Sequence, residues 1–223
     1  MHHIGGIPLT YTALSPVWQR IFELSFASLC EGSRAIAAVI TDSEGRILSE
    51  GLNRCAASPV PNARTAHAET EAVIGLDTAR FPDLHSYTLH TGLEPCVMCM
   101  GTLVMGGIRH IEMAASDEYS GAAGLLQHME FLRQKQITIT RTDPVLGEMQ
   151  RGFQTVRELL YNEDAERLQR ILEDFCVRNR RGTLAARDLV RESALTPERL
   201  SGMDAQTLFD SLAQRIEADP LTP

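Results

Sequence analysis

The segment from Pro95 to Cys99 carries the clearest chemical signal in the sequence, because two cysteines stand three positions apart directly after a proline. Proline is favoured in the first turn of a helix, so the segment predicts a helix that begins at Pro95 and ends by Gly106-Gly107. Cysteines at i and i+3 of that turn face the same way, so both sulfurs can reach one tetrahedral metal ion. The helix N-terminus also favours their thiolate forms. We therefore expect Cys96 and Cys99 to be metal ligands.

Three His-x-Glu triplets could supply a third ligand and an acid–base group: His67-Ala68-Glu69, His110-Ile111-Glu112 and His128-Met129-Glu130. The second lies inside a predicted strand, where a surface pair is the ordinary interpretation. The third lies on a predicted helix after the cysteines, where side chains at i and i+2 point about 200° apart. Only the first begins its own helix upstream of the cysteines, so that two helix N-termini can converge on one point. We expect His67 to be the third ligand, and His110 and His128 to be structural or surface residues.

Two cysteines and one histidine leave the fourth position of a tetrahedral zinc ion to water, which is typical of a catalytic site. Bound zinc lowers the pKa of that water from about 15.7 toward about 7. Glu69, beside the ion but not a ligand, would then be the acid–base group, a role that contributes about 10²–10⁴-fold in rate. A redox pair and half of a structural zinc site are the other interpretations of the cysteines. Both are disfavoured, because the chain has no second Cys-x-x-Cys.

His-x-Glu followed by Pro-Cys-x-x-Cys is the signature of the zinc-dependent deaminases. Beyond it, the stretch from about residue 34 to 124 resembles the bacterial tRNA adenosine deaminases and the related guanine and cytosine deaminases, and the likeness extends more loosely over 17–160. The matching pieces are Gly51 to Arg54, Thr65 to Glu69, Leu93 to Cys99, and Asp117 with Gly121 to Gly124. The resemblance implies a cytidine-deaminase-like fold, a three-layer α/β/α sandwich, with one zinc ion per chain and a homodimer.

The same resemblance implies a set of substrate contacts. Asn53 would hydrogen-bond the bound base, although by itself it is equally well a turn residue that closes a strand. Ala68 would lie against the substrate, and Asp117 at the substrate entrance. The chain also departs from the family: Tyr119 stands where the tRNA enzymes tend to carry a basic residue, and the strand from Ala35 lacks their frequent Pro-x-Gly opening.

These residues together predict a hydrolytic deaminase that releases ammonia from a small amino-substituted nucleobase or nucleoside. A tRNA wobble adenosine deaminase is the alternative, which the Gly-Ala-Ala-Gly match favours. The net charge of −8 disfavours it, because proteins that hold a phosphate backbone are usually basic. A family member without activity that serves as a binding partner is a more remote alternative, since all four catalytic residues are present.

The elements that must position these residues follow from hydrophobic patterning and turn signals. The predicted strands cover 35–41, 46–53, 87–91, 109–115 and 136–141. The predicted helices cover 17–31, 66–76, 95–106 and 124–134, and a long connection runs from 55 to 65. Strands that alternate with helices after an initial hairpin predict an α/β domain with a mixed sheet of about five strands.

The chain from about Leu146 onward reads as helix throughout, with Gly182-Thr183 as a separator and Thr196-Pro197-Glu198 as a helix start. We divide the chain into a deaminase domain, 1–160, and a helical extension, 161–223. Apolar residues of the extension recur at helical spacing, so it needs a surface to cover. We expect it to serve assembly or closure of the pocket and not chemistry.

Bulk composition agrees with a cytoplasmic protein. Of its 223 residues, 43% are hydrophobic and 22% charged, which is the balance of a soluble globular chain. No membrane partner is expected, because no run of about 18 apolar residues occurs. The N-terminus lacks the features of a secretory signal. Five cysteines, an odd number, favour free or metal-bound thiols in a reducing compartment.

Overall fold

The computed structural model of the protein describes residues 3–4, 7–57 and 59–218. The strands in these ranges are β1 (His3–Ile4), β2 (Ile7–Pro8), β3 (Ala37–Thr41), β4 (Ile47–Leu52), β5 (Thr88–Leu93), β6 (His110–Ala115) and β7 (Thr138–Arg141). The helices are α1 (Pro16–Cys30), α2 (Ala68–Ile74), α3 (Val97–Met105), α4 (Glu130–Gln134), α5 (Pro144–Tyr161), α6 (Ala165–Arg178), α7 (Arg180–Glu192), α8 (Pro197–Ser201) and α9 (Ala205–Ala218).

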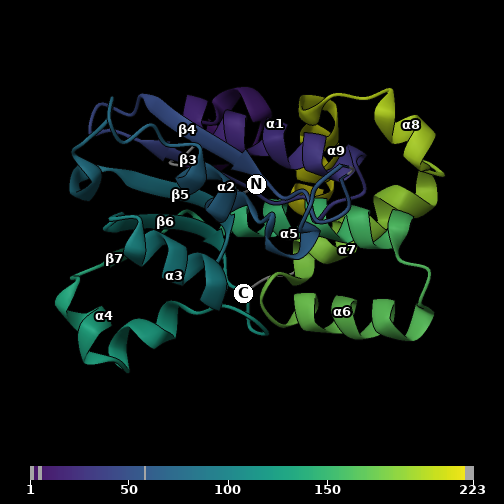
Figure 1. Ribbon diagram of the computed structural model, residues 1–223. Helices are drawn as coiled ribbons and strands as arrows, with labels where there is room; N and C mark the ends of the chain where they lie inside the picture. The colour runs from purple at the N-terminus through teal and green to yellow at the C-terminus, as the bar shows by residue number, and fades with distance from the viewer. Residues whose placement is uncertain (1–2, 5–6, 58, 219–223) are drawn as a thin grey trace.

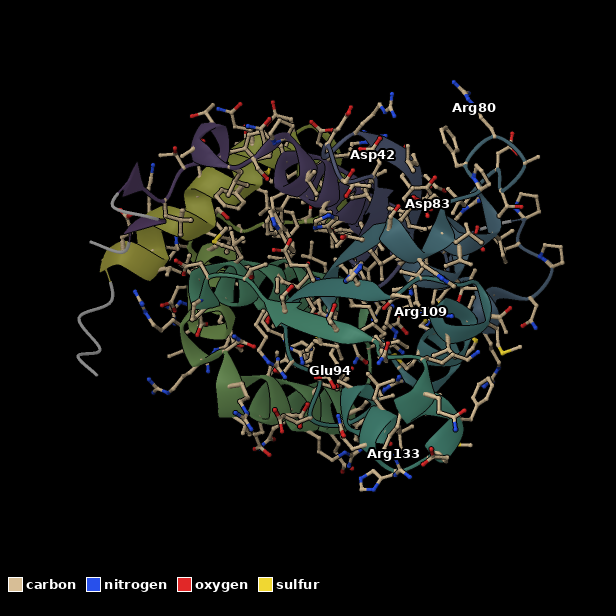
Figure 2. All side chains as sticks on the ribbon, turned by 90° about the vertical axis from the view of Figure 1, so that its left-hand side faces the viewer. Asp42, Arg80, Asp83, Glu94, Arg109 and Arg133 are labelled. Carbon is tan, nitrogen blue, oxygen red and sulfur yellow. The ribbon has the colours of Figure 1, made fainter. Side chains whose placement is uncertain are left out.

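Five of the strands form one mixed sheet in the order β4-β3-β5-β6-β7. β3 pairs antiparallel with both β4 and β5, whereas β5, β6 and β7 run parallel. β4 and β5 therefore point the same way, and the chain segments that follow them emerge at the same edge of the sheet. Figure 2 views the molecule from the opposite end, where Asp42, Asp83 and Arg109 lie in the turns.

β3 shows why the sheet is covered on both faces. Its small and β-branched residues are all buried, and they alternate between two hydrophobic clusters. Ala37 and Val39 belong to a cluster with α1 and α5, while Ala38 and Ile40 belong to one with α2 and α3. A strand that is buried on both faces requires helices on both sides. The predicted three-layer α/β/α sandwich is confirmed (Figure 1).

The C-terminal helices extend the layer on the α1 and α5 side. The Phe22 ring of α1 lies 5.2 Å from that of Phe153 on α5 and 4.9 Å from that of Phe209 on α9. Leu189 of α7 belongs to the same cluster. α6 differs from its neighbours, because none of its residues is buried, although it is strongly amphipathic. It lies beside α5 and α7 at the lower edge of Figure 1.

Two expected boundaries are wrong. Gly182-Thr183 does not separate two helices but lies inside α7, and the break falls at Asn179. Gly182 is needed there because an added Cβ would meet the backbone oxygen of Glu148 on α5 at 1.8 Å.

The expected helix over 124–134 is divided into a 3₁₀ helix, Ala123–Gln127, and α4, because Met129 is extended. Thr196 caps α8 as expected, by accepting a hydrogen bond from the Arg199 amide.

Membrane insertion of a helix has no support in the described residues. None of their helices is both long and apolar enough to cross a bilayer.

Candidate functional site

The site is assembled where α2 and α3 begin. His67 is the N-cap residue of α2, which follows β4 and its long connection, and Cys96 is the N-cap residue of α3, which directly follows β5. The expectation that Pro95 opens the helix is therefore wrong by two residues, since α3 begins at Val97. Pro95 precedes the cap, and its carbonyl accepts a hydrogen bond from the Ala122 amide. Because β4 and β5 end at the same edge, the two helix N-termini meet there, as the sequence predicts.

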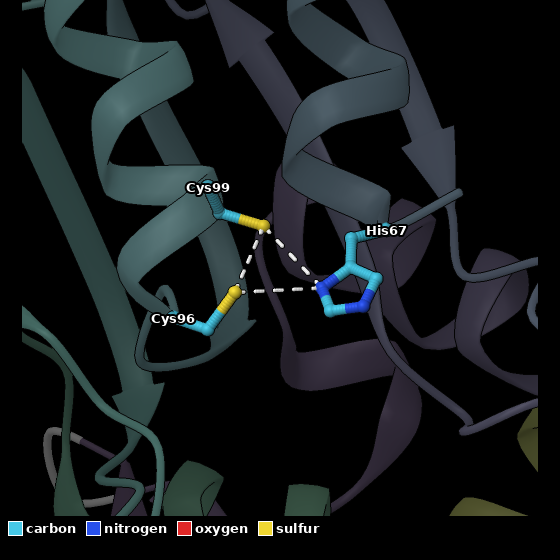
Figure 3. A group of neighbouring side chains, drawn as sticks. All are labelled: His67, Cys96 and Cys99. Carbon is cyan, nitrogen blue, oxygen red and sulfur yellow. Dashed lines mark hydrogen bonds between the residues drawn. The ribbon is translucent and has the colours of Figure 1, made fainter. Parts of the chain in front are cut away.

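His67, Cys96 and Cys99 converge on one point (Figure 3). The Nδ1 atom of His67 lies 3.6 Å from the Cys96 sulfur and 3.5 Å from the Cys99 sulfur, and the two sulfurs are 3.6 Å apart. Cys99 is fully buried, while the other two are half-buried. Among the described residues, these three form the group of histidine, cysteine and acidic side chains that could hold a metal ion.

The spacing of these three atoms matches tetrahedral coordination. Ligand distances of about 2.3 Å for sulfur and 2.0–2.1 Å for nitrogen place the ligand atoms of a tetrahedral zinc site about 3.6–3.8 Å apart. The three measured separations agree with that range to within about 0.1–0.2 Å. Soft thiolate sulfurs with one imidazole are also a donor set that zinc favours. The residues present therefore fit a zinc ion with three protein ligands.

Glu69 lies beside this group on the first turn of α2. Its side chain is only 4% exposed, and its Oε2 atom lies 3.3 Å from the Cys99 sulfur, which donates to it. Burial raises the pKa of Glu69 to about 7, because desolvation penalises the carboxylate. A carboxyl group is thus placed against the ligands without belonging to the three-atom group.

The thiols and the imidazole polarise one another. The Cys96 pKa is lowered, first by its hydrogen bond with the Cys99 side chain and also by its hydrogen bond with His67. The His67 pKa is raised to about 10, and the largest cause is a hydrogen bond with the Cys55 side chain. Cys55 was missed by the sequence prediction. It belongs to the loop after β4, and a lone cysteine 12 positions before the histidine gives no spacing signal.

The expected substrate contacts Asn53 and Ala68 border the group. Asn53 is buried, and its side-chain oxygen accepts hydrogen bonds from the backbone amides of Arg34 and Cys55. Burial by itself would raise the Cys55 pKa, but it is lowered, because hydrogen bonds with the side chains of His67 and Asn53 favour the thiolate. Ala68 is fully buried at the first position of α2.

Asp117 and Tyr119 lie in the loop after β6, which closes over the start of α3 through a bridge between Cys96 and Gly121. The Asp117 carboxylate accepts hydrogen bonds from the backbone amides of Tyr119 and Ser120 and from the Ser120 hydroxyl. These bonds stabilise the turn that contains Asp117. The Tyr119 side chain is 91% exposed.

Glu94 fixes the position of this loop by accepting hydrogen bonds from the backbone amides of Asp117 and Ala123. Gly121 makes room for it, because an added Cβ would lie 2.6 Å from the Glu94 carboxyl carbon. A cavity of about 450 Å³ opens beside the loop, and we call it the acidic pocket. It is lined by Glu94, Ser116, Asp117, Glu118, Gly121, Arg141 and Arg178.

The other two His-x-Glu triplets do not join the site. His110 is exposed and its Nδ1 atom lies 2.8 Å from the Thr138 hydroxyl, while Glu112 pairs with His90 at 2.6 Å. His128 is exposed.

Comparison with known proteins agrees with this geometry. The sequence model of the MafB19-like deaminases matches residues 16–175. This range includes His67, Cys96 and Cys99, which we call the metal-ligand group because they could hold a metal ion. The chain belongs to the MafB19-like deaminase family. Its fold is the cytidine-deaminase-like fold that the sequence resemblance implied.

Two curated relatives share part of the chain. A tRNA-specific adenosine deaminase of Haemophilus influenzae is 33% identical over 127 residues, which are 56% of this chain and 72% of the relative. A probable cytosine deaminase of Schizosaccharomyces pombe is 38% identical over 88 residues, which are 40% of this chain. The match spans about half, 51%, of that relative's length.

One solved structure is similar in fold to this chain. The guanine deaminase of Nitrosomonas europaea superimposes with a TM-score of 0.52 over 71% of this chain and 97% of its own, at 23% identity. The three named relatives carry the names of three different deaminases, so the shared fold and motifs do not select a base.

Proposed function

We propose that this MafB19-like family member is a zinc-dependent hydrolytic deaminase of a small amino-substituted nucleobase or nucleoside. The observation that carries the proposal is the convergence of His67, Cys96 and Cys99 at tetrahedral spacing with the buried Glu69 against them. A structural zinc site normally uses four protein ligands, whereas three ligands beside an acid–base group are typical of a catalytic one.

Each residue of the site has a defined task in this proposal. His67, Cys96 and Cys99 would hold a zinc ion, which when bound would supply the acidity that makes water a nucleophile near neutral pH. Glu69 would take one proton from water and pass it to the ring nitrogen, and would then move the second proton, from the added hydroxyl, to the departing amine. Water adds to the carbon that bears the amine, the carbon–nitrogen bond breaks, ammonia leaves and a carbonyl remains. Asn53 and the backbone at Ala68 hold the base in register.

Several features favour a small substrate over tRNA. The net charge is −8, and the acidic pocket beside the loop after β6 is lined by three carboxylates against two arginines, Arg141 and Arg178. Tyr119, uncharged and exposed, stands where the tRNA enzymes tend to be basic. A phosphate backbone that crossed this region would meet like charge, which disfavours binding.

We also propose that the protein acts in the cytoplasm and that it forms a homodimer. The five cysteines are free, so the thiols depend on a reducing compartment to remain available for metal. Ile74 on α2 and Met105 on α3 are large apolar side chains, 73% and 77% exposed, on the layer that carries the site. A second copy of the chain would cover such side chains.

Ammonia release from a panel of substrates tests the proposed function. The panel contains cytosine, guanine, adenine, their nucleosides and a wobble-adenosine tRNA stem-loop. We expect turnover of a base or nucleoside that changes little between low and high salt. Turnover confined to the stem-loop, with rates that collapse as salt rises, would replace the proposal with tRNA deamination. No ammonia from any substrate by zinc-loaded protein would overturn both.

A further inference from the structure

A second cavity, of about 250 Å³, opens on the other side of the site, and we call it the arginine pocket. It is formed by the segments that follow α1 and β4, the end of α5 and the start of α6. Its lining residues are Ser33, Arg34, Cys55, Ala56, Arg157, Tyr161, Asn162 and Arg167. Three of these are arginines, and none of the described lining residues is acidic.

Two of the three guanidinium groups have no hydrogen-bond or ion-pair partner among the described residues. Arg34 and Arg167 are exposed, and neither side chain makes a hydrogen bond or an ion pair with the described residues. Most other arginines around the site are engaged: Arg178 pairs with Glu118 at 2.7 Å, and Arg151 donates to the Ser116 carbonyl. Two free cations in one small cavity repel each other, so the pocket favours an anion between them.

The third arginine is held rigid. Arg157 donates from Nε to the Gly32 carbonyl at 3.0 Å and from one terminal nitrogen to the buried Glu158 at 2.9 Å, so that its other terminal nitrogen can donate to a ligand. Ser33 adds a neutral donor, because its oxygen accepts from the Ala56 amide while no acceptor for its hydroxyl hydrogen is found in 3–4, 7–57 or 59–218. Fixed donors of this kind bind a phosphate group without first having to be ordered.

The arginine pocket adjoins the metal-ligand group. Cys55 lines the pocket and hydrogen-bonds the His67 side chain, so one residue separates the pocket from a ligand. Asn53 also links the arginine pocket to the site, because its side-chain oxygen accepts hydrogen bonds from the backbone amides of Arg34 and Cys55. A base that donates to or accepts from Asn53 therefore has its remaining substituents beside the pocket.

We propose that the arginine pocket binds the phosphate group of a mononucleotide whose base lies in the metal site. This inference rests on the proposed function and extends its substrate class from nucleosides to nucleoside monophosphates. A single phosphate is favoured over a nucleic-acid backbone, because the arginine pocket has three arginines and no acidic lining residue, whereas the acidic pocket has three carboxylates against two arginines. A polyanion that spanned both pockets would be attracted at one and repelled at the other.

Inorganic phosphate tests the pocket independently of catalysis. Titration of zinc-loaded protein, followed calorimetrically, should show saturable binding of one phosphate per chain. Arg34→Ala and Arg167→Ala should each weaken it about tenfold or more, since an arginine–phosphate hydrogen bond is charge-assisted. Arg170→Ala is the matched control, because Arg170 lies on the same helix, pairs with Glu166 and does not line the pocket. No saturable binding, or equal weakening by Arg170→Ala, would overturn the inference.

Substrate selectivity is the second test. The wild type should prefer a nucleoside 5′-monophosphate to its nucleoside in kcat/KM, and Arg167→Ala should reduce that preference about tenfold or more while Arg170→Ala retains it. A preference that Arg167→Ala leaves intact would contradict the inference. An equal fall in kcat/KM on a tRNA stem-loop in Arg167→Ala would contradict it as well. If phosphate binds as described but no substrate releases ammonia, the proposed function fails and the anion site stands.

Discussion

The metal-ligand group and α6 border the same site but are held in opposite ways. The ligands stand at the starts of α2 and α3, whose residues Ala68, Leu103 and Met100 belong to the hydrophobic cluster against the sheet. α6 has no buried residue. Its contacts include a stacking of Arg151 on Phe175, 4.4 Å from the ring centroid, and the exposed ion pair between Arg178 and Glu118.

This difference assigns chemistry and selectivity to separate parts of the molecule. Ligand atoms must keep their mutual spacing to a fraction of an ångström, and burial of their helices ensures it. α6 instead contributes Arg167 to the arginine pocket and Arg178 to the acidic pocket. An element with few buried contacts can open and close at low cost, which suits a wall that admits substrate. Changes at the metal centre should therefore abolish activity, and changes on α6 should adjust it.

The largest effect is expected from Cys99→Ser. Serine keeps the size of the side chain but replaces a soft thiolate with a hydroxyl, which binds zinc poorly. We expect zinc content to fall from about one ion per chain to trace levels, and activity to fall with it. Elemental analysis and ammonia release measure the two. His128→Ala is the control, because His128 is exposed and outside the site, and it should keep both. A fully zinc-loaded Cys99→Ser variant would show that the ligand set is wrong.

Glu69→Gln should separate proton transfer from metal binding. Glutamine has the shape of the buried side chain but cannot accept and deliver the proton, so kcat should fall by about 10²–10⁴-fold. Zinc content and the free energy of unfolding should stay close to those of the wild type. Measurement of zinc and kcat in the same preparation decides the point. Loss of zinc would make Glu69 a ligand, and an unchanged kcat would remove it from the mechanism.

The metal-ligand group was predictable because its signal is local. Cys96 and Cys99 are one helical turn apart, and His67 is selected by its place at the start of the preceding helix. The alternation of strands and helices then places both starts at one edge of the sheet. Short motifs together with regular topology were sufficient to predict the fold and the convergence of His67, Cys96 and Cys99.

The arginine pocket was not predictable, because it depends on tertiary packing. Arg34 and Arg167 are 133 positions apart in the sequence, and no spacing rule connects them. Their approach depends on how the end of α5 turns into α6. Gly182 illustrates the same limit: local propensity marks glycine as a helix breaker, but the close approach of α7 to α5 requires it inside the helix. Cys55 lies near His67 for a similar reason, through the path of the connecting loop.

The smallest effect is expected where α6 meets the loop after β6. The ion pair between Arg178 and Glu118 has side chains 62% and 37% exposed, so water screens it and its contribution to stability should be below about 1 kcal/mol. Arg178→Ala should therefore keep zinc and lower the free energy of unfolding in urea by no more than that. Arg191→Ala is the control, since Arg191 forms a comparable exposed pair with Asp188 on α7.

A double-mutant cycle of Arg178→Ala with Glu118→Ala isolates the pair from other effects of each change. Amide hydrogen exchange adds the comparison between regions. In Arg178→Ala, exchange should accelerate in α6 and stay unchanged in α2 and α3, because the lost contact joins α6 to the loop after β6 and to neither of those helices. A loss of about 3 kcal/mol or more, or faster exchange at the metal centre as well, would show that α6 unfolds together with the core. Chemistry and selectivity would then share one cooperative unit, and the distinction between the two regions would not hold.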